Sequence, residues 1–329
     1  MTSKIRSLVM NSPTRIPLLI GIYAGLEITG ASVREAVSNS KKQVEAILAL
    51  HKQFHTQLLL TAMDLSVEAE AFGCQVRLTD DEIPTVIRKM EINADQINRL
   101  SVPEVGKDRT EVQLKTSRDL VAQNLGLPVL GGIIGPFSLA GRIIGVSEAL
   151  ELSLSDPDLL ESLLSKVTRF LIDYTRAFRD EKADGVIMAE PAAGLLSPRG
   201  LSRFSSKYVK EIVDETQCDE FSVVYHNCGA RMIHLSEIIK TGAEIFHFGA
   251  PMDIAKALEQ VDRNTILAGN LDPASVFLNG TVEEVIDQTK KLLGVTAACR
   301  NFIISSGCDI PPHTPIANLE AFYSTVRSD

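Results

Sequence analysis

Short apolar runs, many of them rich in β-branched residues, alternate along the chain with longer amphipathic segments. This alternation predicts a parallel sheet whose strands are joined by helices. Strands are expected at residues 17–23, 57–63, 128–134, 185–189, 221–225, 244–248, 265–268 and 302–305. Most of these runs are continuously hydrophobic, which is typical of strands that are buried on both faces. Helices are expected between them, for example at residues 33–54, 157–179, 203–215 and 282–293.

Eight strands with intervening helices predict an α/β fold of the (β/α)8 TIM barrel type. A single domain over residues 1–329 is expected, because barrels of this kind reach such a length without a second core. A doubly wound open sheet is the alternative. The connection between the second and third predicted strands is unusually long, and residues 66–126 are expected to add helices that cover one end of the barrel.

Charge and composition restrict the possible partners. The chain has 33 Lys and Arg against 42 Asp and Glu, a net charge of −9, which argues against nucleic acid because phosphate binding needs a basic surface. The longest apolar region, residues 127–150, is interrupted by Pro136 and Arg142, so a membrane span of about 20 apolar residues is not expected. The odd number of cysteines, five, and the absence of a secretory signal favour a cytoplasmic protein without a disulfide framework.

Polar side chains of the kind that bind metals or substrates follow several predicted strands directly. Active sites of (β/α)8 barrels lie at the carboxyl ends of the strands, so these positions are candidates for function. A polar residue placed there is also costly to bury without a partner. The candidates are Asp64, Glu190, His226 with Cys228, His247, Asn270 with Asp272, and Cys308 with Asp309.

One histidine and two cysteines among these candidates predict a zinc site. His226 and Cys228 follow the strand that ends in VVY, and Cys308 follows the run FIISSG. Imidazole nitrogen and thiolate sulfur are ligands that suit zinc. Three protein ligands leave a fourth coordination position open for a substrate, as in catalytic zinc sites. The alternative is a buried cysteine beside a histidine that bonds to backbone carbonyls.

Glu190, in VIMAEPAAG, has three possible roles. As a catalytic residue, it is expected either to be a fourth metal ligand that the substrate displaces or to orient His226 through its carboxylate. It is otherwise an acid paired with Arg199 or Lys182.

The remaining candidates also have two interpretations each. Asp64 either contributes to catalysis by binding substrate or caps the helix that follows it. Asn270 and Asp272, in AGNLDP, either line the pocket and bind the cofactor or form a turn. His247 and His313 lie at or near the carboxyl ends of strands, and His247 is expected to take part in catalysis.

Several segments of the chain resemble the uroporphyrinogen decarboxylase superfamily. They are MDLSVEAEAFG, GPFSLAGRIIG, GNLDP, the pair His226-x-Cys228, and GCDIPPHTP at residues 307–315. More narrowly, the histidine and two cysteines resemble the methyltransferase branch, which contains the methylcobamide:coenzyme M methyltransferases and the chloromethane-type enzymes. The resemblance runs from about Thr14 to Tyr323, nearly the whole chain.

This resemblance implies a barrel with zinc held by His226, Cys228 and Cys308. It also implies methyl transfer between a corrinoid (methylcobamide) carrier, held on a separate corrinoid-binding protein, and a thiol such as coenzyme M. The alternative within the branch is a methyl donor:corrinoid protein methyltransferase, for example an O-demethylase component. The decarboxylases carry an arginine pair in an N-terminal motif like RQAGR, whereas the corresponding stretch here, PLLIGIYAGLEITG, has no arginine. Porphyrinogen decarboxylation is therefore less expected.

Overall fold

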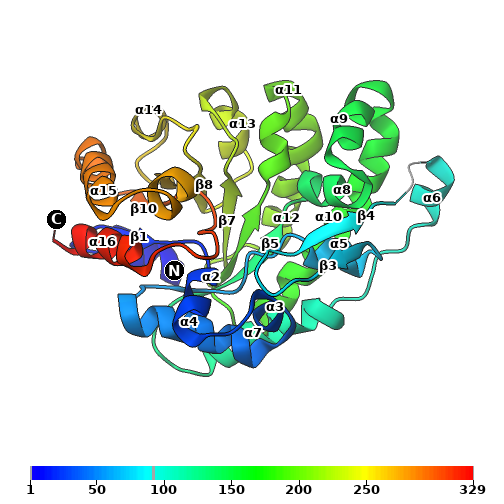
Figure 1. Ribbon diagram of the computed structural model, residues 1–329. Helices are drawn as coiled ribbons and strands as arrows, with labels where there is room; N and C mark the ends of the chain where they lie inside the picture. The colour runs from blue at the N-terminus through cyan, green and yellow to red at the C-terminus, as the bar shows by residue number, and fades with distance from the viewer. Residues whose placement is uncertain (1, 91–92, 329) are drawn as a thin grey trace.

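The computed structural model describes residues 2–90 and 93–328, and its centre is a sheet of eight parallel strands (Figure 1). The strand order is β1-β10-β9-β8-β7-β6-β5-β2. The eight strands are β1 (Ile16–Leu18), β2 (Leu59–Leu60), β5 (Val129–Ile134), β6 (Gly185–Ala189), β7 (Ser222–Asn227), β8 (Ile245–Phe248), β9 (Ile266–Leu271) and β10 (Phe302–Ser306). Each overlaps one of the predicted strands, so the parallel α/β prediction is confirmed.

The sheet is curled so that its concave face encloses a single inner core. One buried cluster takes side chains from every strand: Leu18, Leu60, Leu130, Ile187, Val224, Ile245, Ile266 and Ile303. The strands follow one another around this core in chain order, without the reversal that defines a doubly wound sheet. In the described residues β1 and β2 form the two ends of the sheet and are not paired with each other. The structure is therefore a curled, barrel-like sheet.

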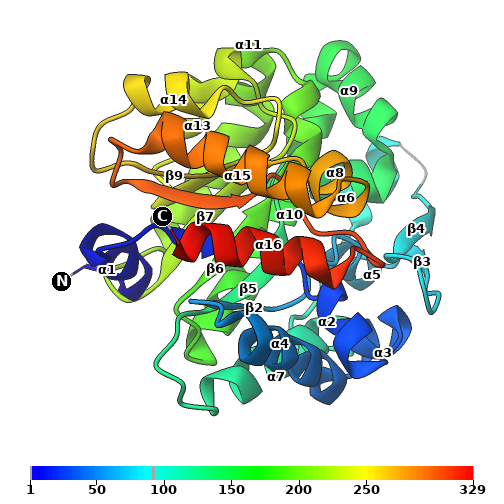
Figure 2. The same ribbon diagram turned by 60° about the vertical axis from the view of Figure 1, so that its left-hand side comes forward.

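Helices surround the sheet, and most of them cover its convex face (Figures 1 and 2). They are α1 (Lys4–Asn11), α2 (Tyr23–Thr29), α3 (Val33–Ser38), α4 (Ser40–Phe54), α5 (Val67–Ala71), α6 (Ala94–Arg99), α7 (Asp108–Val121), α8 (Pro136–Ile144), α9 (Val146–Ser155), α10 (Pro157–Asp180), α11 (Pro198–Leu201), α12 (Lys207–Thr216), α13 (Leu235–Ile239), α14 (Ile254–Gln260), α15 (Val282–Thr296) and α16 (Ile316–Arg327). None in the described ranges is long and apolar enough to cross a membrane.

Short irregular helices follow the ends of three strands and place loops near the carboxyl edge of the sheet. They are the 3₁₀ helices η1 (Pro191–Leu195) and η3 (Met232–His234) and the π-helical segments η2 (Ser202–Ser206) and η4 (Pro273–Leu278). The helix expected at 203–215 is thus a π-helical turn continued by α12.

One local prediction was wrong and a second was incomplete. The helix expected over 33–54 is interrupted at Asn39, whose backbone is extended and whose side chain accepts hydrogen bonds from the first N–H groups of α4. The long connection over 66–126 does contain α5, α6 and α7, but it also forms an antiparallel hairpin of β3 (Gln75–Arg77) and β4 (Thr85–Arg88). These strands are short and mostly exposed, so they lack the apolar pattern that identifies a buried strand.

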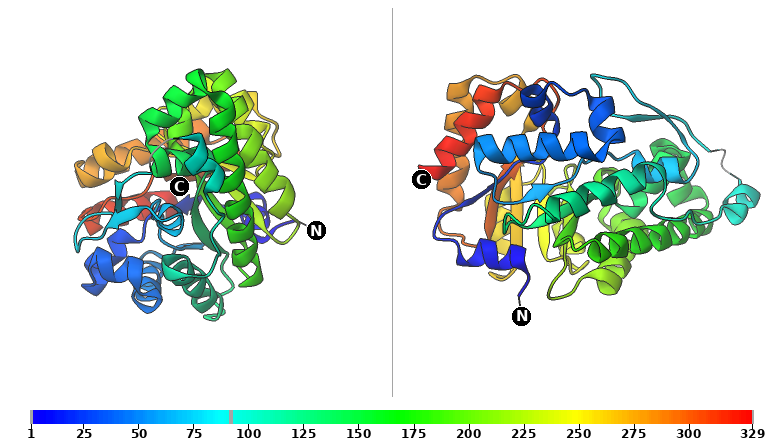
Figure 3. Two further views of the ribbon diagram at one scale, coloured as in Figure 1. Left: turned by 90° about the vertical axis from the view of Figure 1, so that its right-hand side faces the viewer. Right: turned by 90° about the horizontal axis from the view of Figure 1, so that it is seen from below.

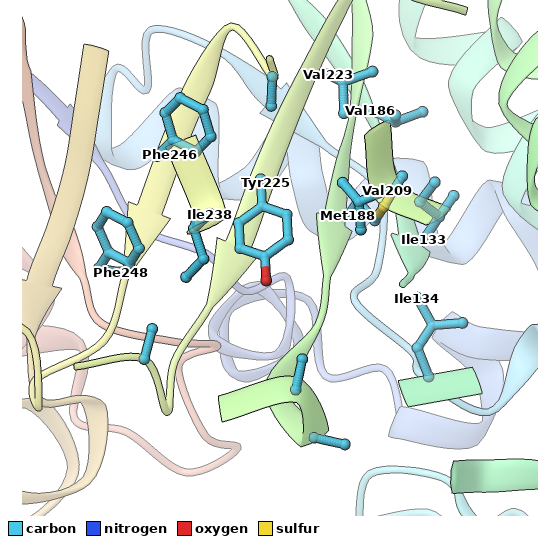
Figure 4. Close-up of a cluster of buried hydrophobic side chains, with 14 of the residues drawn as sticks. Ile133, Ile134, Val186, Met188, Val209, Val223, Tyr225, Ile238, Phe246 and Phe248 are labelled. Carbon is cyan, nitrogen blue, oxygen red and sulfur yellow. The ribbon is translucent and has the colours of Figure 1, made fainter. Parts of the chain in front are cut away.

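The outer core packs between the sheet and its helices. Strand residues that alternate with those of the inner core point outward, as Val186, Met188, Val223, Tyr225 and Phe246 do in Figure 4. They meet side chains of α12 and α13, Val209 and Ile238. At the amino ends of the strands, α1 closes the inner core with Ile5 and Val9 (Figure 3). Loops at the opposite, carboxyl end are left to form a site.

Candidate metal centre

Strand alternation brings three polar side chains to the inner face at the carboxyl end of the sheet. His226 lies two residues after Val224 on β7, and His247 lies two residues after Ile245 on β8, so each shares the inner face with its apolar neighbour. The two histidines are direct register partners across β7 and β8. Ser305 has the same relation to Ile303 on β10. These positions continue the apolar inner core into a polar patch.

The structure brings the three expected metal ligands together. One ligand atom each of His226, Cys228 and Cys308 lies within 4.8 Å of the others. Over residues 2–90 and 93–328, no other group of three or more His, Cys, Asp or Glu side chains meets this criterion. His226 is buried and both cysteines are partly exposed, so the cluster opens to solvent on its sulfur side. An imidazole and two thiols in this arrangement fit a zinc ion with one free coordination position.

Glycines allow the loops that carry the cysteines to approach each other. A Cβ atom on Gly249 would lie 2.2 Å from the carbonyl oxygen of Cys228, and a Cβ on Gly307 would lie 3.1 Å from the Cα of Gly249. The turn of Cys228 is held by Asn227, whose Oδ1 accepts the N–H of Gly229 at 3.1 Å. The loops after β7, β8 and β10 thus pack backbone against backbone, and this contact sets the separation of the thiols.

The two thiols are coupled. A hydrogen bond from Cys308 lowers the pKa of Cys228 to about 7, although burial opposes the shift. The same bond, together with burial, raises the pKa of Cys308 to about 12. One thiolate is therefore available near neutral pH, and a metal has to displace the proton of the other.

His247 lies behind His226 and fixes the direction of its ring. The Nδ1 atoms of the two histidines are 2.8 Å apart in a hydrogen bond, and Nε2 of His247 is 2.8 Å from Oγ of Ser305. Burial, and then the nearby His226, lowers the pKa of His247 well below its usual value, so its ring is neutral near pH 7. Since Nδ1 of His226 is engaged, its Nε2 is the nitrogen left for a metal.

Glu190 caps a helix and makes none of the side-chain pairs that were expected. Its carboxylate accepts the N–H groups of Phe137 and Ser138, each at 2.8 Å, and the hydroxyl of Ser205 at 2.8 Å. These N–H groups belong to the first turn of α8, where the helix dipole favours an anion. The structure shows no bond from the carboxylate to His226, Arg199 or Lys182 within the described ranges. Only its main-chain N–H reaches the histidine, donating to the carbonyl of residue 226 at 2.8 Å.

Asp64 forms a buried ion pair. Its Oδ2 is bonded to Arg109, and its Oδ1 accepts the N–H of Ser66 at 3.0 Å and the hydroxyl of Ser66 at 2.6 Å. Arg109 also contacts Glu70, with Nε and Oε2 2.5 Å apart. The local bonds to Ser66 resemble the capping role that was expected, although the residue that flanks α5 is Ser66 itself. The ion pair with Arg109 was not foreseen.

The turn interpretation is confirmed for Asp272, and cofactor binding by Asn270 and Asp272 stays a prediction. The amide of Asn270 donates to the carbonyls of Gly249 at 3.1 Å and Met252 at 2.7 Å, which ties the loop after β8 to β9. Asp272 caps η4 by accepting the N–H groups of residues 274 and 275 at 3.0 and 2.7 Å. Both residues also line an open cavity of about 380 Å³.

Other residues at this end of the sheet were missed or misplaced. Ser305 was not singled out, although its place on a predicted strand put it on the same face as Ile303. His234, at the end of η3, is buried and its ring bonds to the carbonyl of Leu196 at 3.1 Å. His313 pairs with Glu27 at 2.9 Å on the surface. Asp309 has a buried Oδ1 without a hydrogen-bond partner in the described structure.

The chain is similar to known proteins over nearly its whole length. A model of the uroporphyrinogen decarboxylase (URO-D) family matches residues 7–328. The chain is 30% identical to the methylcobamide:CoM methyltransferase MtbA of Methanosarcina acetivorans, over 92% of this chain and 89% of the relative. It is 24% identical to the methylcobamide:CoM methyltransferase MtaA of Methanosarcina barkeri, over 92% and 88%. It is 25% identical to a uroporphyrinogen decarboxylase of Prochlorococcus marinus, over 93% and 88%.

Solved structures support the same fold. A methyltransferase from Methanosarcina mazei superposes with a TM-score of 0.86 over 98% of this chain and 97% of that one, at 23% identity. A B12-independent methionine synthase from Shewanella superposes with a TM-score of 0.58 over 96% and 97%, at 12% identity. On the family match and on the similarity to MtbA, this chain belongs to the uroporphyrinogen decarboxylase family.

Proposed function

We propose that the protein is a zinc-dependent methyltransferase that moves a methyl group between a corrinoid (methylcobamide) carrier and a small thiol such as coenzyme M. The observation that carries the proposal is the convergence of His226, Cys228 and Cys308 within 4.8 Å of one another. The relatives MtbA and MtaA, which are methylcobamide:CoM methyltransferases, support the substrate class. For the fold, we infer that the curled sheet is a (β/α)8 barrel in which β1 and β2 close the inner core.

The donor set fits zinc better than a harder metal. Two sulfurs and one imidazole nitrogen are soft or intermediate ligands, whereas magnesium and calcium need oxygen. When bound at these three residues, zinc would lower the pKa of a substrate thiol, so that a thiolate nucleophile is available at neutral pH. The open sulfur side of the cluster is where that thiol would enter.

His247 serves in this proposal as a positioning residue, not as a group that touches substrate. It holds His226 through the bond between the Nδ1 atoms, and Ser305 holds His247 in turn. If Nε2 of His226 binds the metal, its Nδ1 carries the proton and donates to His247. Nε2 of the neutral His247 then donates to Oγ of Ser305, which fixes one tautomer throughout.

Glu190 and Asp64 are also assigned positioning roles. Glu190 joins the start of α8 to the end of β7, because its carboxylate caps the helix and its N–H bonds to the backbone of His226. Asp64 and Arg109 form a buried ion pair: both charges act on Tyr23, and the charge of Asp64 also acts on Asp309, the neighbour of Cys308. We infer that this pair shapes the wall of the thiol site. Asn270 and Asp272 line the neighbouring cavity and are proposed to contact the corrinoid carrier.

In the proposed reaction the methyl group passes from cobalt to sulfur. The cobalt–carbon bond of the methylated corrinoid breaks, both of its electrons stay on cobalt as Co(I), and a sulfur–carbon bond forms. The proton of the thiol is released to solvent. The same ligands would serve a protein that loads the corrinoid from a methyl donor, so the donor and acceptor have to be found by assay.

The experiment is to mix zinc-loaded protein with methylcobalamin and a panel of thiols that includes coenzyme M, and to follow the corrinoid absorbance. Zinc-dependent demethylation with one thiol, lost in a Cys228→Ala, Cys308→Ala double variant, is the expected result. Activity only with a methoxylated aromatic or a methylamine as donor would assign the corrinoid-loading role instead. Turnover of uroporphyrinogen without demethylation would identify a decarboxylase, although the segment containing β1 and α2 has no arginine to bind its carboxylates.

A further inference from the structure

An open, largely apolar groove lies at the carboxyl end of the sheet beside the candidate metal centre. It has a volume of about 620 Å³, and α9, η1, α11 and η2 form its walls. Leu154 on α9 is 87% exposed and Leu195 on η1 is 64% exposed. Large aliphatic side chains with this much contact with water, gathered along one groove, are typical of a surface that another protein covers.

The groove is continuous with the loop that carries Cys228. A Cβ atom on Gly194 would lie 2.7 Å from the carbonyl carbon of Gly229 and 3.0 Å from Oδ1 of Asn227. The 3₁₀ helix η1 therefore packs directly against the turn of the metal ligand. Leu195 is the next residue in the chain, so a protein that covers it also lies beside Cys228.

The apolar surface extends across η3 and carries unpaired positive charge. His234 bonds through its ring to the carbonyl of Leu196, which joins η3 to the end of η1, and its neighbour Ile233 is 65% exposed. Arg199 on α11 lines the groove, and Arg231 precedes η3. Over residues 2–90 and 93–328, neither arginine forms an ion pair, whereas Arg203, which also lines the groove, pairs with Asp158 and Glu161. A partner with acidic side chains would complement this surface.

We propose that Leu154, Leu195, Arg199, Arg231 and Ile233, here called the groove surface, form the docking site of the corrinoid-binding protein. This inference rests on the proposed function, because the corrinoid-binding protein must bring the methyl–cobalt group of its corrinoid to the open side of Cys228 and Cys308. A corrinoid is too large to be enclosed in a small-molecule pocket together with the protein that holds it. The corrinoid-binding protein therefore has to bind at the surface next to this opening. The partner should present apolar side chains to the leucines and carboxylates to the arginines.

The experiment compares two methyl donors with the same enzyme variants. The donors are free methylcobalamin and a methylated corrinoid protein of the same organism, produced separately. The variants are Leu195→Asp and Arg199→Glu. Leu125→Asp is the matched control, since Leu125 is 45% exposed but lies in the loop before β5, at the opposite end of the sheet.

We expect kcat/KM with the corrinoid protein to fall at least tenfold in both groove variants and to stay within twofold in the control. With free methylcobalamin, all three variants should match the unsubstituted protein within twofold. Equal losses with both donors, or no loss with the corrinoid protein, would overturn the docking site while leaving the proposed function intact.

Direct binding separates this inference from a failure of the proposed function. If no thiol is methylated from either donor, the affinity of the zinc-loaded protein for the corrinoid protein is still measured by isothermal titration. Binding that is lost in Leu195→Asp but kept in Leu125→Asp supports the groove surface, and binding that is unchanged or absent contradicts it. Sedimentation tests the other occupant: a change of oligomeric state in Leu195→Asp alone would show that the groove joins two copies of this chain.

Discussion

Replacing His247 with phenylalanine should weaken zinc binding without removing a metal ligand. Phenylalanine has nearly the shape of histidine, so the buried ring site stays filled while both ring nitrogens are lost. His226 then has no partner at Nδ1, where a hydrogen bond of 2.8 Å held its ring. Oγ of Ser305 loses its bond to the same side chain.

The expected magnitude follows from the two broken bonds. Loss of the group that orients a ligating histidine typically lowers metal affinity by about 10- to 100-fold, or about 1.4–2.8 kcal/mol. Each buried polar atom left without a partner costs about 1–3 kcal/mol of folding free energy. The free energy of unfolding should therefore fall as well, and the assay has to separate the two effects.

Zinc affinity is measured at pH 7.5 by competition with a chromophoric chelator, at a temperature where circular dichroism shows each variant to be folded. His234→Phe is the matched control, because His234 is also buried and hydrogen bonded but lies outside the metal ligands. We expect a dissociation constant raised 10- to 100-fold in His247→Phe and changed less than twofold in His234→Phe. An unchanged constant in His247→Phe, or an equal loss in both variants, would refute the positioning role.

Three further predictions concern ionisable groups that are buried or partly buried. The pKa values of Cys228 and Cys308 are about 7 and about 12, so zinc binding should release about two protons from the thiol pair at pH 6 and about one at pH 8. Calorimetry in buffers of different ionisation enthalpy measures the number of protons released. Equal release at both pH values would contradict the coupling of the two thiols. Burial raises the pKa of Glu68 to about 8, so this carboxyl destabilises the fold progressively as the pH rises from about 4.5 to 8. In urea unfolding, Glu68→Gln should therefore be more stable than the unsubstituted protein by about 2–4 kcal/mol at pH 8 but not at pH 5. The same difference in stability at both pH values would exclude titration of this carboxyl. Glu190→Gln should lose about 1–3 kcal/mol of stability, because an amide cannot accept all three hydrogen bonds that the carboxylate accepts, but it should keep its zinc. Loss of zinc at unchanged stability would show that Glu190 is a metal ligand.

The strands could be predicted because buried parallel strands are continuous apolar runs. The polar residues after those runs then identified the end of the sheet that carries the site. His226 and His247 could be placed on one face from alternation alone, since each lies two residues beyond an inner-core residue. Ser305 satisfies the same rule on β10 and could have been found in this way.

The approach of Cys228 to Cys308 was expected, because both follow strands at the same end of the sheet. The close packing of their loops was not, because it depends on the curl of the sheet across β8 and β9 and on glycine contacts between loops far apart in the sequence. Other contacts between distant segments could not be predicted either. The role of Glu190 depends on the first turn of α8, whose N–H groups donate to its carboxylate although they lie some fifty residues earlier in the chain. The bond between Asp64 and Arg109 joins segments on either side of the unforeseen hairpin. Periodicity reports burial, and it carries no information on which polar groups meet.

The most direct test of the central claim is X-ray absorption at the zinc edge, recorded with and without coenzyme M. His226, Cys228 and Cys308 as ligands predict two sulfurs, one imidazole nitrogen and one exchangeable light ligand per zinc in the protein alone. Addition of the thiol should raise the sulfur count from two to three, because the thiolate takes the open position. A zinc shell without two sulfurs, or a sulfur count that stays the same with every thiol that the protein methylates, would contradict the account.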